Sequence, residues 1–289
     1  MKRSAVLTIL LEWNNDMEMY QQLLSLASKT QDYEIPIQPG VVWSLRTAPN
    51  ALIPGNTGFG KSFFTLYLVI MASIKNAILF LADPKRSDLS SLSAFMPPER
   101  VVWEAEKIAA MVHNVVDIMM EQYGYMQTER LRRELFQADF VDFGLPIIII
   151  FIEEMAALVS SLDRKARESF EADIKKITLQ GRQAGAIIAS ILQTPSTENI
   201  NSEIRSQMLF RVFLGNSVSG IERRMIFGEG HTYSQRVFSP GQGLYMLAGQ
   251  TERPEVIEAP RLDKSQLPAT LKLALKPQFD RNPQPPAPL

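Results

Sequence analysis

The stretch Gly55-Asn56-Thr57-Gly58-Phe59-Gly60-Lys61-Ser62 decides the fold of this chain. It fits the pattern G-x-x-x-x-G-K-[S/T], and its surroundings predict a short strand at 50–53 before it and an apolar helix at 63–73 after it. Glycines let backbone N–H groups converge on phosphate oxygens, and a helix N-terminus adds positive potential. The stretch therefore predicts a phosphate-binding P-loop in an α/β domain.

The residues of this loop divide the work of holding a nucleotide. We expect Lys61 to reach the β and γ phosphates of ATP and the Ser62 hydroxyl to hold Mg²⁺, so ATP and Mg²⁺ are the predicted cofactors. A chance glycine-rich turn is the alternative, and the agreement of strand, loop and helix disfavours it. The predicted nucleotide-binding residues are Gly55, Asn56, Thr57, Gly58, Gly60, Lys61 and Ser62.

Two acids supply the second signal. Residues 146–152 are mostly β-branched and show no alternation, which predicts a central strand covered on both faces. Glu153 and Glu154 follow directly. A P-loop enzyme needs one acid for the Mg²⁺ water shell and another to polarise the attacking water, so we assign Glu153 to the metal and Glu154 to catalysis. Two solvent-exposed acids at a strand end are the alternative.

The remaining pattern predicts strands that alternate with helices, hence a mainly parallel sheet. We expect a hairpin at 34–46, strands at 77–82, 186–192, 210–214 and 243–247, and helices at 104–137 and 164–180. Gly124 is expected to break the first of these helices into a helical hairpin, and the Pro-rich end from Pro277 is expected to be extended and poorly ordered. We divide the chain into a helical lead at 1–33, a nucleotide-binding domain at 34–265 with a helical insertion at about 104–140, and a Pro-rich tail at 266–289.

The amino-acid composition excludes several kinds of site and partner. The 289 residues are 46% hydrophobic and 21% charged, as in an ordinary globular protein. Lys and Arg number 30 against 31 Asp and Glu, so a nucleic-acid partner would have to meet a local basic surface. The absence of cysteine excludes disulfides, thiolate zinc sites and cysteine nucleophiles. Apolar runs are too short for a membrane span, which takes about 20 residues.

Several segments beyond the P-loop resemble one family, the FtsK/SpoIIIE and HerA-like DNA-pumping ATPases, and among them the coupling proteins of Gram-positive conjugative elements. The resemblance runs from about Val41 to Pro260. Its segments are Asp83-Pro84-Lys85 with Asp88-Leu89, Phe151-Ile152-Glu153-Glu154, Gly181-Arg182-Gln183-Ala184-Gly185, and Gln193 with Pro195.

The resemblance implies further roles. In this family the Gly-Arg-x-x-Gly segment supplies an arginine finger and the glutamine senses phosphate, so Arg182 and Gln193 join Glu154 as predicted catalytic residues. Three residues depart from the family: Phe59 stands in place of a small residue, Glu153 in place of Asp, and Thr194 where Arg is frequent. These departures make ATP binding a firmer expectation than ATP turnover.

The resemblance also implies a RecA-like core that assembles into a homo-hexameric ring and pulls DNA without sequence preference. A relaxase and membrane-channel components are candidate partners, and the expected location is the cytoplasm at the inner face of the cell membrane, reached through a missing anchor or a partner. Arg130, Arg132 and Arg133 are candidate DNA contacts, with a solvated helix face as the alternative. Two other functions remain open: a nucleotide-dependent scaffold, and a protein-secretion ATPase that does not pump DNA.

Overall fold

The computed structural model describes residues 17–193, 202–216, 220–232 and 236–286. The described part forms an eight-stranded sheet in the order β10-β9-β8-β3-β7-β6-β4-β5. The pairs from β8 to β5 are parallel, and β9 runs antiparallel to both of its neighbours. The sequence prediction of an α/β fold with a mainly parallel sheet is confirmed. The sheet strands are β3 (Ala51–Pro54), β4 (Ile78–Ala82), β5 (Val101–Val102), β6 (Ile148–Glu153), β7 (Ala186–Leu192), β8 (Phe210–Leu214), β9 (Gln242–Leu247) and β10 (Glu255–Glu258).

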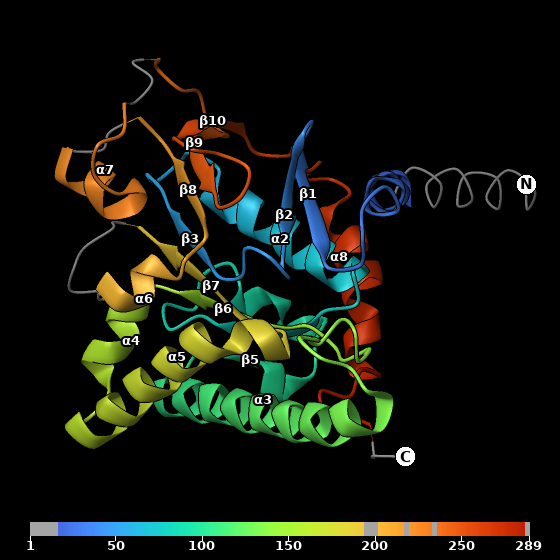
Figure 1. Ribbon diagram of the computed structural model, residues 1–289. Helices are drawn as coiled ribbons and strands as arrows, with labels where there is room; N and C mark the ends of the chain where they lie inside the picture. Colours follow the sequence, from blue (N-terminus) through green and yellow to red (C-terminus); the bar gives the residue numbers. More distant parts are fainter. Residues whose placement is uncertain (1–16, 194–201, 217–219, 233–235, 287–289) are drawn as a thin grey trace, which may run out of the picture.

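Helices cover both faces of this sheet. Figure 1 shows α3 (Ala105–Arg133) and α5 (Arg164–Ala184) on one face, and α2 (Lys61–Ile74) with α8 (Leu267–Leu275) on the other. β6 and β7 lie between these layers, and their apolar residues are buried as the unbroken β-branched run predicted. The shorter helices are α4 (Met155–Ser161), α6 (Ser202–Ser206) and α7 (Gly220–Phe227), with 3₁₀ turns η1 (Ser90–Ala94), η2 (Pro98–Arg100) and η3 (Lys276–Phe279).

α3 is one continuous helix of 29 residues, so the helical hairpin expected at Gly124 is wrong. Glycine costs roughly 1 kcal/mol inside a helix relative to alanine, which is too little to break a helix that tertiary packing supports. Buried Met119 and Met126 lie on either side of Gly124. The helix ends instead at Glu134, whose φ of 52° is left-handed.

The glycines of the Gly181–Gly185 segment have structural tasks. Gly181 lies inside α5, and a Cβ there would stand 2.1 Å from the Ala186 carbonyl oxygen, so only glycine lets the helix end pack against β7. Gly185 caps α5 in the left-handed conformation with a φ of 75°. α5 therefore continues four residues beyond the predicted end at 180, and Arg182 is a helical residue.

Two elements outside the sheet pack against α2. The predicted hairpin is present as the antiparallel strands β1 (Glu34–Gln38) and β2 (Val41–Ser44). The described part of the N-terminal lead is helical at 17–27, and the Lys75 amine after α2 donates to the carbonyl oxygens of Ala27, Thr30 and Gln31 at 2.5 to 2.8 Å. The lead at 17–31 is thus tied to the end of α2, and residues 1–16 lie outside the described part.

The C-terminal segment is folded through Arg281, which corrects the expectation of a poorly ordered end for residues 277–281; residues 287–289 lie outside the described part. α8 packs on α2, where the Ser73 hydroxyl donates to the Ala274 carbonyl oxygen at 2.6 Å. Gln278 is fully buried, and the Arg281 guanidinium donates to the Ser73 carbonyl oxygen at 2.8 Å and the Ala77 carbonyl oxygen at 2.9 Å. A prediction from proline content alone does not include these contacts, because they join segments about 200 residues apart.

Candidate nucleotide-binding site

The P-loop lies between the end of β3 and the start of α2, as the sequence predicted. Gly55 lies against β8: a Cβ there would stand 2.7 Å from the Leu214 carbonyl oxygen. Gly58 and Gly60 have φ values of 82° and 85°, a left-handed backbone that other residues adopt at a cost. α2 then begins at Lys61 with no acidic residue in its first turn, so no carboxylate of that turn competes for its free N–H groups.

Lys61 is held at the carboxyl end of β7. Its ammonium donates to the Leu192 carbonyl oxygen at 2.8 Å, and the side chain is largely buried. Burial lowers the pKa of Lys61 from its usual range, while the nearby Glu154 and Glu153 oppose that shift. Gln193 follows directly and lines the same cleft. The structure therefore brings together the P-loop lysine and the predicted sensor glutamine; Thr194 and Pro195 lie outside the described residues.

Glu153 ends β6 and lines the cleft. Its carboxylate accepts a hydrogen bond from the Ser87 hydroxyl at 2.8 Å. Burial raises the pKa of Glu153; the Ser87 hydrogen bond lowers it, and the neighbouring Asp83 carboxylate raises it further. A cation beside Ser62 would offset this concentration of negative charge, which fits the metal role predicted for Glu153.

Glu154 is buried next to the cleft rather than in its wall. Its φ of 50° is left-handed, an unusual conformation for a non-glycine residue and one that is frequent at functional sites. The carboxylate accepts a hydrogen bond from the Gln193 backbone N–H and lies 3.6 Å from the Lys85 ammonium. Glu154 is thus linked to both sides of the cleft through Gln193 and Lys85.

The loop after β4 contributes residues to which the sequence assigned no role. Asp83 is fully buried and accepts from the Ser90 backbone N–H at 2.9 Å, which fixes the loop. Its carboxylate also lies 3.1 Å from the Ser87 hydroxyl oxygen, whose one hydrogen it shares with Glu153. Lys85, Ser87 and Asp88 then line the cleft. In the sequence, the Asp-Pro-Lys segment at the end of a strand could have identified these residues as part of the site. Polar residues at the carboxyl edge of a parallel sheet meet at the binding crevice.

These residues surround a cleft of about 620 Å³, within the range of about 300–1,000 Å³ that ligand pockets occupy. Two of its lining residues, Leu267 and Leu271, come from α8, about 200 positions after the P-loop, and the sequence held no signal for them. The cleft is lined by Asn56, Thr57, Gly58, Gly60, Lys61, Ser62, Phe63, Leu66, Lys85, Ser87, Asp88, Ser91, Glu153, Gln193, Leu267 and Leu271.

Arg182 does not lie in this cleft. It is exposed in the last turn of α5, just before the start of β7, whereas Lys61 meets the end of β7. Strands rise about 3.3 Å per residue, so the two ends of this seven-residue strand are about 20 Å apart. Arg182 therefore cannot contact a nucleotide bound by its own P-loop.

The candidate DNA contacts at the end of α3 bond to groups of the same chain, while the side chains of Arg132 and Arg133 stay partly exposed. Arg132 and Arg133 bond the fully buried Glu129 carboxylate at 2.5 and 2.7 Å. Arg130 donates to the Ala138 carbonyl oxygen at 3.3 Å. These contacts secure the end of the helix, and the role of the three arginines in DNA contact stays a prediction.

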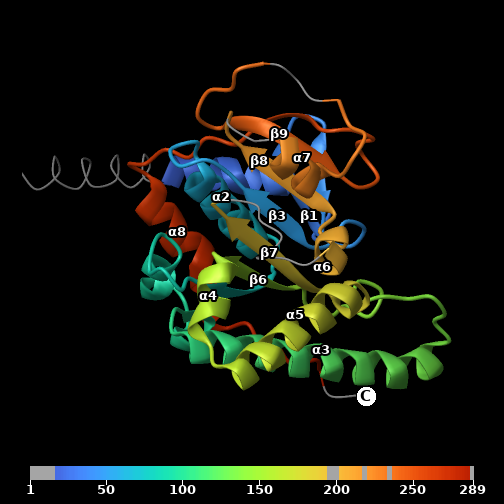
Figure 2. The same cartoon turned by 90° about the vertical axis from the view of Figure 1, so that its left-hand side faces the viewer.

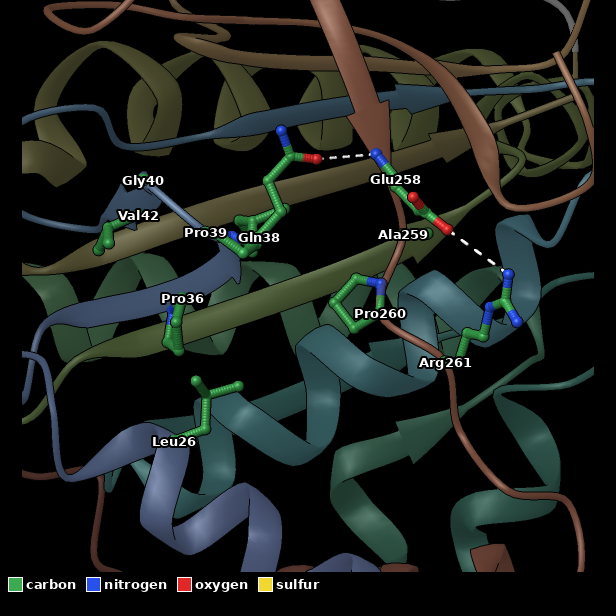
Figure 3. Close-up of a pocket in the computed structure, with 11 residues that line it drawn as sticks. Leu26, Pro36, Gln38, Pro39, Gly40, Val42, Glu258, Ala259, Pro260 and Arg261 are labelled. Atoms are coloured by element: carbon green, nitrogen blue, oxygen red, sulfur yellow. Dashed lines mark hydrogen bonds and ion pairs between the residues drawn. The ribbon is translucent and has the colours of Figure 1, made fainter.

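A second cavity, of about 530 Å³, lies beside the hairpin and is separate from the P-loop (Figure 3). Gln38 accepts from the Glu258 backbone N–H at 2.8 Å, and the Glu258 carboxylate pairs with Arg261 at 3.5 Å. The polar side chains of this cavity are therefore already engaged in contacts within the cavity wall, and its other lining residues are apolar or glycine.

The cleft fits Mg²⁺ as a partner of a nucleotide. Mg²⁺ takes oxygen ligands and is commonly held by one or two protein groups together with phosphates and waters. Ser62 and Glu153 offer a hydroxyl and a carboxylate in the same cleft. Within the described ranges, no group of three or more acidic, histidine or cysteine side chains could hold a metal ion alone. No helix in the same ranges is long and apolar enough to cross a bilayer.

Fold and site together define a P-loop nucleotide-binding protein with the fold of the FtsK and HerA type of ATPase. Among sequence relatives, the chain is 30% identical over 195 residues to the FtsK domain-containing protein YdcQ of Bacillus subtilis, a match that covers 68% of this chain and 40% of that protein. It is 24% identical over 255 residues to the DNA translocase FtsK of Corynebacterium efficiens, covering 81% of this chain and 26% of that protein. The resemblance predicted from the motifs is confirmed, and the chain spans less than half the length of these relatives. No family model matches.

Solved structures show the same fold. The pCW3 conjugation coupling protein TcpA, in a monomer form with ATPγS, superimposes with a TM-score of 0.63 at 17% identity, covering 81% of this chain and 67% of that one. ATPases 2 and 3 of EssC from Geobacillus thermodenitrificans superimpose with a TM-score of 0.62 at 14% identity, covering 87% of this chain and 50% of that one.

Proposed function

We propose that this protein is an ATP-driven motor that moves DNA. The observation that carries the proposal is the convergence of Lys61, Ser62, Glu153 and Gln193 on one cleft at the carboxyl edge of the sheet. The proposal that the molecule moved is DNA rests on relatives that are named DNA translocases.

The residues of the cleft have the following tasks when ATP is bound. The N–H groups of the P-loop and of the first turn of α2 bind phosphate oxygens. Lys61 exchanges the Leu192 carbonyl oxygen for the β and γ phosphates, which is favourable because a carbonyl only partly compensates a buried ammonium. Ser62 and Glu153 would hold Mg²⁺, which supplies neutralisation of phosphate charge.

Glu154 is the proposed group that orients the attacking water. Its ion pair with Lys85 restrains the carboxylate, since the two groups lie 3.6 Å apart. Lys85 also lines the cleft, so a bound γ-phosphate would compete with Glu154 for this ammonium. Gln193 is the proposed phosphate sensor, because its backbone N–H bonds Glu154 and its residue lines the cleft.

Arg182 is proposed to act in trans, in a homo-hexameric ring. Its exposure at the opposite edge of the sheet is compatible with reaching a neighbouring subunit's cleft, and its own cleft is about 20 Å away along β7. The arginine finger and the ring both derive from the family resemblance.

The finer proposal is a coupling protein that delivers DNA to a conjugative channel at the cytoplasmic face of the membrane, with a relaxase and channel components as partners. The fold shared with the TcpA coupling protein supports it. The test is the ATPase rate with and without single-stranded and duplex DNA, across a salt series, with Lys61→Ala as the control. We expect DNA to stimulate the rate and salt to abolish the stimulation, because phosphate contacts release counterions. A rate that DNA does not change at low salt would refute the DNA-motor proposal and leave a nucleotide-dependent scaffold or a protein-secretion ATPase.

A protein-secretion ATPase is the second candidate. The observation in its favour is that EssC, and EccC of Thermomonospora curvata, described as a type VII secretion ATPase, share the fold at TM-scores of 0.62 and 0.59. Competition between duplex DNA and a candidate protein cargo in the same ATPase assay separates the two. Stimulation by the protein cargo that DNA does not displace would favour secretion.

A further inference from the structure

The nucleotide cleft has an apolar end to which the phosphate-binding motifs assign nothing. Phe63 and Leu66 of α2 line it, and Leu267 and Leu271 of α8 line the same cleft. α2 rises about 1.5 Å per residue, so Leu66 lies about 7.5 Å along the helix from Lys61. The P-loop and the loop after β4 surround Lys61 with polar groups, so these apolar side chains are the part of the cleft wall that suits a nucleoside.

α8 is held in place beside α2 by several contacts. Its Ala274 carbonyl oxygen accepts from the Ser73 hydroxyl at 2.6 Å, and Gln278 just beyond it donates to the same hydroxyl oxygen at 3.0 Å. Before the helix, the Lys264 ammonium lies 5.2 Å from the centre of the Phe63 ring. Figures 1 and 2 both show α8 alongside α2. The C-terminal segment is therefore a fixed wall of the cleft.

We propose that α8, through Leu267 and Leu271, forms the base-binding wall of the nucleotide site together with Phe63 and Leu66. A purine base offers two flat apolar faces, which contact with leucine and phenylalanine side chains removes from water. These four side chains carry no hydrogen-bonding group, so they bind adenine and guanine alike. The inference rests on the proposed nucleotide function and adds the part of the chain that holds the nucleoside.

The test compares ATP with inorganic tripolyphosphate, which has the phosphates and no nucleoside. Leu267→Ala should weaken ATP and GTP binding about fivefold to tenfold, as the loss of about a kcal/mol of apolar contact implies, and leave tripolyphosphate affinity unchanged. Leu273→Ala is the matched control, because Leu273 lies on the same helix, is also half-buried and does not line the cleft. It should leave all three affinities as in the unmodified protein.

Leu267→Met keeps the apolar area and should restore ATP affinity, whereas a general disturbance of α8 would also weaken tripolyphosphate. ATP affinity unchanged in Leu267→Ala, or ATP and tripolyphosphate weakened equally, overturns the base-wall proposal. If Lys61→Ala alters neither ligand, or the unmodified protein binds neither, the nucleotide function itself has failed.

Discussion

Replacing Gln278 by alanine should destabilise the whole domain, although Gln278 lies in a Pro-rich segment eleven residues from the end of the chain. Its amide oxygen accepts from the Leu79 backbone N–H at 3.1 Å, and its amide nitrogen donates to the Ala77 carbonyl oxygen at 2.8 Å. β5 pairs with β4 only at Leu81 and Ala82. Gln278 therefore hydrogen-bonds the backbone of the part of β4 that has no strand partner on this side among the described residues. The side chain acts as a substitute for strand pairing.

The size of this destabilisation depends on which hydrogen-bond partners remain after Gln278 is replaced. In the variant, Ala77 keeps its hydrogen bond from Arg281, whereas the buried Leu79 N–H has no other described partner. One orphaned buried donor costs about 1–3 kcal/mol, and the lost packing of a fully buried side chain adds about 1 kcal/mol. We expect a loss of about 3 kcal/mol in the free energy of unfolding, or about 6 to 12 °C in Tm.

Urea denaturation followed by far-UV circular dichroism measures this loss. Gln284→Ala is the matched control, since Gln284 is exposed in the same segment, and its unfolding free energy should stay within about 0.5 kcal/mol of the unmodified protein. Equal stability of the two variants would refute the packing of the C-terminal segment against β4.

The remaining predictions concern the site. Lys61→Ala should abolish ATP binding in a calorimetric titration, because it removes the cation that neutralises the phosphates. Unchanged ATP affinity would refute the P-loop assignment. Glu154→Gln should bind ATP without hydrolysing it, and Glu153→Gln should raise the Mg²⁺ concentration needed for turnover; the reverse pattern would exchange the two roles. Arg182→Ala should lower the ATPase rate about 10³- to 10⁵-fold, the contribution of arginine fingers in P-loop enzymes. Mixing it with Lys61→Ala should restore part of the rate, because an intact cleft then meets an intact finger; no recovery in rings shown to exchange subunits would count against the trans role.

Local patterns in the sequence predicted most of the sheet and the phosphate end of the site. The run at 146–152, for example, identified β6 because a strand covered on both faces needs apolar residues at every position. The prediction failed where local propensity competes with packing. Gly124 stays helical because buried neighbours stabilise α3. Gly181 does not end α5: its glycine is required because β7 approaches too closely for a side chain, and the helix is capped at Gly185.

The sequence by itself predicted that the chain folds around a P-loop and which residues are proposed to meet phosphate, because that chemistry is carried by eight consecutive residues and the elements beside them. Only the tertiary structure decided that Glu153 lines the cleft while Glu154 is held by Gln193 and Lys85, and that Arg182 lies at the far edge of the sheet. It alone placed α8 against the cleft. Such contacts join positions up to 247 residues apart, and the periodicity of a sequence reports which face of an element is buried but not what covers it.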